Sequence, residues 1–114
     1  MFEIEFYKTE NEKCLVEEFL EALPVKLRAK AIRDLDILEE KGNTLREPYS
    51  KPLVQGLFEL RISVSKDEAR IFYFFLVDNR IVLTHGFIKK TQKTPSKEIE
   101  KALEYKADYE RRCL

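Results

Sequence analysis

The residues of this chain best suited to chemistry are cations that stand near the ends of predicted strands. Arg61 lies near the end of one strand, Arg70 begins the next, and His85, Lys89 and Lys90 stand at or just after the end of a third. Arginine binds phosphate through its planar fork, and lysine binds it as a point charge. Positioned cations also stabilise negative charge that develops during a reaction. If these side chains converge, they form a phosphate site in which His85 or a lysine transfers protons.

These residues also have plain structural interpretations. Arg61 could form an ion pair with Glu59 or Glu68, because a lone arginine in a strand is more often structural than catalytic. His85 could be a partly buried, hydrogen-bonded histidine. Arg70 leads an aromatic strand face, where an unpaired buried charge would be costly. The sequence leaves both interpretations open.

Aromatic residues lie close to the cations. Tyr73 and Phe87 are either core residues or aromatics that contact a nucleic-acid base. A concave cationic surface with aromatic side chains suits single-stranded RNA. Cleavage of RNA requires activation of a ribose 2′-hydroxyl, stabilisation of the charged phosphorane and protonation of the leaving 5′-oxygen. Positioned cations can supply much of that stabilisation.

The charge of the chain is unevenly distributed. The 21 basic and 21 acidic residues give a net charge of zero, which argues against indiscriminate binding to nucleic acids. Residues 1–47 carry a net charge of −4, and residues 48–114 carry +4. The stretch from His85 to Lys97 holds four lysines and no acidic residue. This stretch is either part of a positive surface or a solvated loop whose lysines favour solubility.

Other function classes leave no trace in the sequence. It contains no glycine-rich nucleotide loop, no HExxH motif and no nucleophile elbow. Cys14 and Cys113 lie near opposite ends with no CxxC motif, so we expect no metal site, no cofactor and a reducing cytoplasm. No apolar run approaches the ~20 residues of a membrane-spanning helix. The acidic, alternating start is unlike a signal peptide.

The first half predicts a strand followed by two helices. Apolar residues alternate over Phe2–Tyr7, as in a half-buried strand. The run Thr9–Glu12 has the spacing of a capping box, which predicts a helix to about Ala22. Pro24 suits the first turn of a second helix, and Gly42 suits its end.

The second half changes to strand periodicity. Residues 43–55 contain two prolines and predict a loop. Three short-turn-connected strands follow, at Leu57–Val64, Ala69–Val77 and Arg80–Gly86. The second of these is nearly all apolar, which predicts a central strand covered on both faces. Thr94 as N-cap and Pro95 at the first helical position predict a last helix to about Arg112.

The elements therefore follow the order βααβββα within a single domain over residues 1–114. This order predicts an α+β fold with a small antiparallel sheet, whose edge the first strand joins. We expect an N-terminal helical hairpin on one face of the sheet and a C-terminal helix. With the helices gathered on one face, the other face is expected to be free for a ligand.

The sequence resembles a known family of small toxins. The segments that carry the resemblance are Leu57–Arg61, Ala69–Tyr73, His85–Pro95 and Glu98-Ile99, and the most specific of them is the run Phe-x-Lys-Lys-Thr-x-Lys-Thr-Pro. Together they resemble the RelE/ParE superfamily, and more closely the HigB-like, phage-related branch of type II toxins. The resemblance covers almost the whole chain.

The resemblance implies a ribosome-dependent mRNA endoribonuclease that acts without a metal and inhibits translation. By motif, Arg61 and Arg70 would hold or stabilise the scissile phosphate. Lys89 and Lys90 would bind the RNA backbone or assist proton transfer. The resemblance also implies contacts to RNA or a part in catalysis for a further set: Lys51, Tyr73, His85, Phe87 and Lys93.

The same resemblance implies partners and alternatives. The expected partners are the ribosome with its mRNA and a cognate antitoxin, such as a HigA-like helix-turn-helix protein. Operator DNA would be bound only by the toxin–antitoxin complex. Two other functions share the fold: a ParE-like gyrase inhibitor, and a non-catalytic protein that helps its antitoxin repress.

Overall fold

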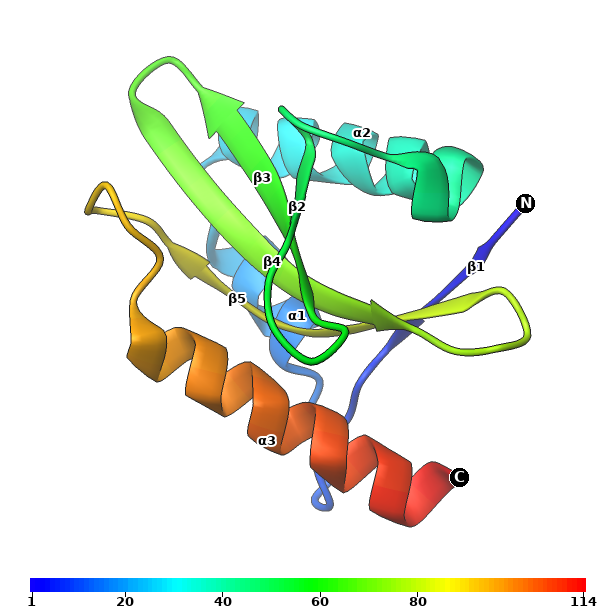
Figure 1. The fold of residues 1–114 in the computed structure, drawn as a ribbon. Coiled ribbons are helices and arrows are strands. Elements are labelled where there is room, and N and C mark those ends of the chain that lie inside the picture. Colours follow the sequence, from blue (N-terminus) through cyan, green and yellow to red (C-terminus); the bar gives the residue numbers. More distant parts are fainter.

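A five-stranded sheet forms the centre of the structure, a computed structural model that describes residues 1–114 (Figure 1). Its strands lie in the spatial order β1-β5-β4-β3-β2. In chain order they are β1 (Glu3–Phe6), β2 (Ser50–Pro52), β3 (Phe58–Val64), β4 (Asp67–Phe75) and β5 (Arg80–Ile88). The predicted three-stranded meander is confirmed as β3, β4 and β5, with β4 at the centre of the sheet.

Two features of the sheet differ from the expectation. The first strand joins the edge as expected, but β1 runs parallel to β5, so the sheet is mixed rather than antiparallel. Alternation of apolar residues shows that a segment is a strand and says nothing of its direction. The short β2 lies within the predicted loop 43–55 and pairs with β3. Three residues that end in a proline are too few to produce a readable period.

Two helices cover one face of the sheet. They are α1 (Leu15–Ala22) and α2 (Val25–Lys41), and they form the predicted N-terminal hairpin. The main core lies between them and the sheet, and its most buried members include Val16, Leu27, Ala31, Leu38, Leu60, Ile62, Ile71 and Leu83. The predicted end of α2 is confirmed, because Gly42 adopts a φ of 53° there. A Cβ on Gly42 would collide with the ring of Phe2, so this position needs glycine twice over.

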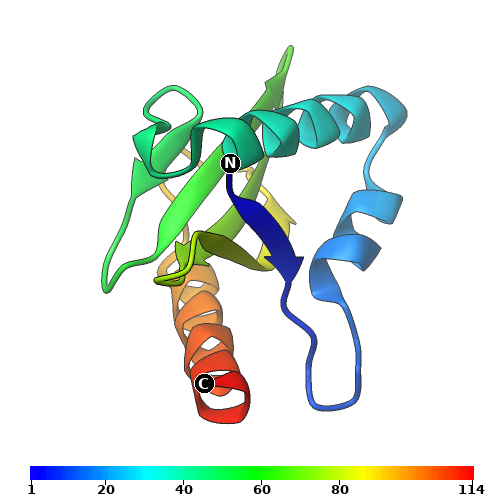
Figure 2. The same cartoon turned by 90° about the vertical axis from the view of Figure 1, so that its right-hand side faces the viewer.

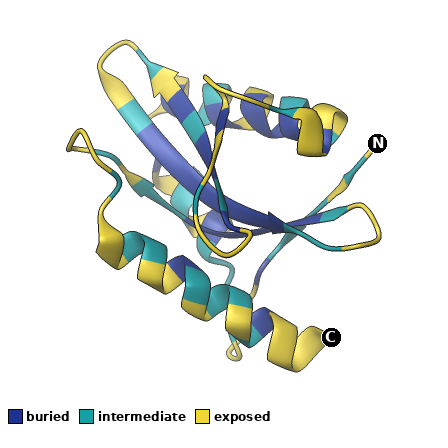
Figure 3. Cartoon of the chain, viewed as in Figure 1, coloured by how far each residue is buried: buried dark blue, intermediate teal, exposed yellow.

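The third helix, α3 (Ser96–Cys113), packs on the opposite face (Figure 2). The expectation of a free sheet face was therefore wrong. Alternate residues of β4 face α3, and Phe72 and Phe74 pack there with Ala102 and Tyr109 of the helix. A strand with apolar side chains on both faces needs a cover on both. Figure 3 shows the result, with β4 buried along most of its length.

The two predicted N-caps, Thr9 and Thr94, were wrong. The Thr9 hydroxyl accepts a hydrogen bond from the Lys13 N–H and closes a tight turn before α1, whose N-cap is Cys14. Glu12 has a φ of 65°, which a capping box at Thr9 does not allow for. At α3 the N-cap is Pro95, and the Thr94 hydroxyl instead donates to Glu59 in the sheet. Tertiary partners have displaced the local hydrogen bond in that case.

No helix of the structure is long and apolar enough to cross a membrane.

Candidate functional site

Strand register brings the two predicted arginines side by side. Arg61 of β3 lies directly opposite Arg70 of β4, and Arg70 lies opposite Phe87 of β5. In the next row, Lys51 of β2 faces Glu59 of β3. All these side chains share the face of the sheet that α3 covers, because side chains alternate along each strand. Like charges directly opposite one another are destabilising, so the arginine pair requires compensation.

Glu59 supplies that compensation and was missed as a functional candidate. Its side chain is only 1% exposed, and its Oε1 lies 3.5 Å from Nε of both Arg61 and Arg70. Glu59 Oε2 accepts the hydrogen bond from Thr94. The structural interpretation of Arg61 as a partner of Glu59 is thus confirmed. The signal in the sequence was a carboxylate two positions before Arg61, on the same face of the predicted strand.

Arg70 is a buried member of this network. Its side chain is 3% exposed, and Nη2 lies 2.8 Å from Oε1 of Glu68. Nη1 donates to the backbone oxygen of Ala69. With its guanidinium occupied in this way, Arg70 acts on the site through its charge and through the groups it holds. Arg61 is 25% exposed, so part of its guanidinium faces outward.

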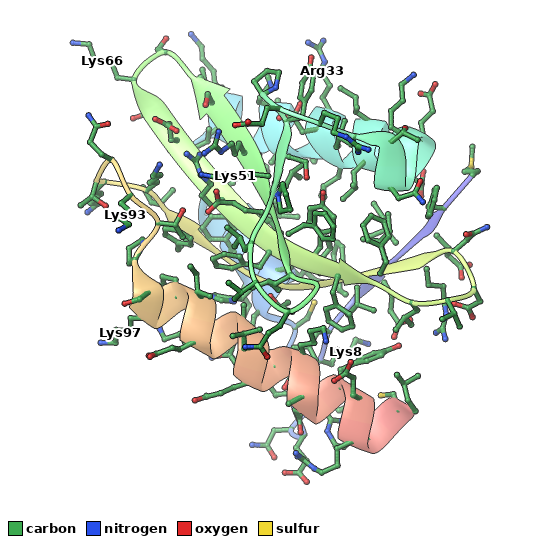
Figure 4. The ribbon with its side chains drawn as sticks, viewed as in Figure 1. Lys8, Arg33, Lys51, Lys66, Lys93 and Lys97 are labelled. Carbon is green, nitrogen blue, oxygen red and sulfur yellow. The ribbon has the colours of Figure 1, made fainter.

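Four of the predicted residues line one cavity. It has a volume of about 280 Å³ and lies among β2, β3 and the loop between β5 and α3. Its cationic members are Lys51, Arg61, Lys89 and Lys93, and its other lining residues are Leu53, Gln92, Thr94 and Ile99. Figure 4 shows Lys51 on β2 and Lys93 on the loop. We call this the cationic cavity.

A second hollow lies next to it. It has a volume of about 610 Å³ and lies between the β3–β4 turn and the β5–α3 loop. Lys66 and Lys90 contribute its lysines, together with Lys89. Lys89 and Gln92 line both hollows. Asp67 and Glu68 also line the second hollow, and Lys89 stands between the two hollows.

The environment of Lys89 alters its titration. Burial lowers the pKa of the Lys89 ammonium, and the positive charge of Arg70 lowers it further. The backbone of Lys89 is also fixed, because its N–H donates a hydrogen bond of 2.9 Å to the backbone oxygen of Glu68. A lysine ammonium with a lowered pKa gives up its proton more readily near neutral pH than an ordinary one.

The remaining predicted residues lie elsewhere or are buried. Tyr73 lies on the opposite face of the sheet, stacks on Phe58 with ring centroids 5.4 Å apart, and shares a hydrogen bond with Ser50. Phe87 is partly buried and stacks on Phe72. Tyr73 and Phe87 therefore occupy the positions of core residues, which was one of the two interpretations of these aromatics.

His85 is enclosed between the sheet and α3. Its Nε2 lies 3.0 Å from Oε1 of Glu98, and its ring packs on Phe72 and Tyr105. Burial lowers the pKa of His85, although Glu98 acts in the opposite direction. His85 is not among the residues that line the cationic cavity. This geometry matches the structural interpretation of the histidine.

The cationic cavity is suited to one kind of chemistry. A partly exposed guanidinium and three lysines can hold a phosphate group and stabilise negative charge on it. Lys89 can supply a proton, and the apolar Leu53 and Ile99 offer contact to a base or sugar. The structure contains no group of three or more His, Cys, Asp or Glu side chains arranged to hold a metal ion.

Comparison with known proteins identifies a family. No curated protein sequence is significantly similar to the chain. The model of a family described as "Phage derived protein Gp49-like (DUF891)" matches residues 18–107. The matched segment includes every residue that lines the two hollows. Because the match covers most of the chain, the protein belongs to the Gp49-like family of phage-derived proteins, a family of the RelE-like toxin type.

Proposed function

We propose that this protein is the toxin of a type II toxin–antitoxin system and that it cleaves mRNA on the ribosome with its own cationic side chains. Membership of a toxin-type family supports the first part. The observation that carries the second part is the cationic cavity, in which Lys51, Arg61, Lys89 and Lys93 converge. A gyrase inhibitor has no need of four cations gathered around one cavity.

The proposed reaction is a transesterification within the RNA. The ribose 2′-oxygen attacks the neighbouring phosphorus and loses its proton to solvent, and the bond from phosphorus to the 5′-oxygen breaks. The products are a 2′,3′-cyclic phosphate and a 5′-hydroxyl. Arg61 stabilises the charge on the phosphorane, and the Lys89 ammonium protonates the leaving 5′-oxygen.

The other lysines hold the RNA chain. Lys51 comes from β2 and Lys93 from the β5–α3 loop; both line the cationic cavity and bind phosphates next to the scissile one. Lys66 and Lys90 bind the backbone in the second hollow. Because the protein carries no net charge, these few contacts give weak binding to free RNA. The ribosome then presents the mRNA and raises its local concentration at the site.

The proposal includes a partner. A cognate antitoxin, such as a HigA-like helix-turn-helix protein, neutralises the toxin, and only the complex binds operator DNA. The acidic residues 1–47 offer a surface of opposite charge to a basic partner.

The test is cleavage of mRNA on programmed ribosomes, with the cut sites mapped by primer extension. We expect the wild-type protein to cut in the ribosomal A site. Arg61→Ala should reduce the rate by roughly 100-fold or more, the scale lost when one transition-state donor is removed. Lys8→Ala removes an exposed lysine outside both hollows and should leave cleavage unchanged.

Two results would contradict the proposal. Induction that stops DNA replication while mRNA stays intact would identify a gyrase inhibitor. Normal growth on induction, together with normal antitoxin binding, would identify a non-catalytic protein that only assists repression.

A further inference from the structure

The most unusual group in the molecule is the buried carboxylate of Glu59. It lies beneath the cationic cavity, and its Oε1 has no hydrogen-bond partner in the structure. The Nε atoms of Arg61 and Arg70 are also buried without hydrogen bonds, and each lies 3.5 Å from that oxygen. A buried charge with such incomplete hydrogen bonding is a poor source of stability, so its presence calls for another explanation.

Glu59 joins three separate segments of the chain. Through Oε1 it faces arginines from two strands, and through Oε2 it accepts the Thr94 hydroxyl from the loop before α3. Arg61 and Thr94 both line the cationic cavity, on different walls. The Glu59 carboxylate thus contacts Arg61 and Thr94, two lining residues of the cationic cavity that come from different segments.

We propose that Glu59 is a positioning residue that fixes the guanidinium of Arg61 and the Thr94 wall of the cationic cavity. Glu59 does not contact a ligand in the cavity itself, because its side chain is only 1% exposed. It acts by holding Arg61 against the repulsion of Arg70, which lies directly opposite. The effect of Glu59 on catalysis rests on the proposed function. Its effect on the position of the Arg61 guanidinium does not.

A second carboxylate provides a matched control. Glu47 Oε1 also pairs with Arg61, at 3.1 Å from Nη1, but the Glu47 side chain is 66% exposed. Exposed pairs contribute little, because water and salt screen them. Glu59→Gln and Glu47→Gln therefore each remove one carboxylate partner of Arg61. The partner lost is buried in the first variant and exposed to solvent in the second.

The first measurement needs no RNA. The NMR signals of the arginine Nε–H groups report how rigidly each guanidinium is held. In Glu59→Gln we expect the Arg61 Nε–H signal to lose its order, while in Glu47→Gln it stays as in the wild type. An Arg61 signal that stays equally ordered in Glu59→Gln would overturn the inference, whatever reaction the protein catalyses.

The second measurement is the rate of mRNA cleavage at saturating ribosome concentration. Glu59→Gln should lower the maximal rate by roughly 10- to 100-fold, since small misplacement of a reacting group has effects of this size. The half-saturating ribosome concentration should change by less than about threefold, because Lys51 and Lys93 still bind RNA. A maximal rate equal to that of Glu47→Gln would overturn the inference.

Substitutions of Thr94 cover the case in which Glu59→Gln does not fold. Thr94→Val removes the hydroxyl and leaves both buried arginine contacts of Glu59 in place. We expect a lowered maximal rate in Thr94→Val and recovery in Thr94→Ser, which restores the hydroxyl. Equal rates for Val and Ser would show that the contact between Glu59 and the loop does not matter. If the wild type cleaves no mRNA, the proposed function is refuted, and the NMR signals still decide the role of Glu59.

Discussion

Replacement of Arg70 tests how the buried ion network contributes to stability. Arg70→Met keeps a straight apolar stem and removes a charge that pairs with Glu59 and Glu68. Loss of one partner from a buried ion pair costs about 3–5 kcal/mol. Removal of Arg70 also relieves its repulsion with Arg61, which returns about 1 kcal/mol. We therefore expect a net loss of about 2–4 kcal/mol in the free energy of unfolding.

A matched control comes from Arg80, a more exposed strand arginine that also has two carboxylate partners. Arg80 pairs with Glu5 at 3.0 Å and with Asp78 at 2.9 Å, but its side chain is 32% exposed. Arg80→Met should therefore cost only about 0–1 kcal/mol. In a domain of this size, 1 kcal/mol shifts the Tm by about 4 °C. We expect Tm to fall by roughly 8–16 °C for Arg70→Met and by less than about 4 °C for Arg80→Met.

The assay is thermal and urea unfolding of both variants, followed by circular dichroism. A double variant, Glu59→Gln with Arg70→Met, removes both charges, so the two losses should be less than additive. Equal losses for Arg70→Met and Arg80→Met would refute the reasoning, because burial would then make no difference to the value of these pairs.

Three further predictions concern single side chains. Burial and the charge of Arg70 lower the pKa of the Lys89 ammonium, so the wild-type cleavage rate should fall at alkaline pH, beginning below the ordinary lysine pKa. Lys89→Arg should bind ribosomes normally, cleave roughly 100-fold more slowly, and lose this pH dependence. Tyr73→Phe should leave cleavage unchanged and reduce the free energy of unfolding by about 1 kcal/mol, since the hydroxyl bonds only Ser50 in the core; altered cleavage sites would contradict this. Burial lowers the pKa of His85 below its value in the unfolded chain, so the stability that His85 contributes is complete above pH ~6.5 and decreases as the pH falls through the folded-state pKa. His85→Gln should flatten this part of the curve of Tm against pH, and an unchanged curve would argue against a neutral buried His85.

Periodicity predicted most of the elements and the partnership of the two arginines. Alternation in β3 and β4 set the faces of Arg61 and Arg70, and the short turn between the strands set their register. These are local properties, which depend on residues close in the chain. The cap at Thr94 failed for the converse reason, since its hydroxyl binds Glu59, 35 positions away.

Features that depend on distant segments escaped prediction. The second sheet face was expected to be free, yet α3 covers it, because nothing local says on which side a terminal helix packs. Tyr73 and His85 each had a core and a site interpretation, of which the sequence favoured the core one. The helices that cover the two sheet faces bury both side chains, in agreement with it.

The sequence by itself determined the meander, the two N-terminal helices and the uneven distribution of charge. Only the tertiary structure decided which cations meet: Lys51, Arg61, Lys89 and Lys93 come from three segments that strand pairing and the β5–α3 loop bring around one cavity. It also gave Glu59 its significance. A glutamate in a strand is ordinary until packing removes its water, and from then on its charge must be balanced by the arginines beside it.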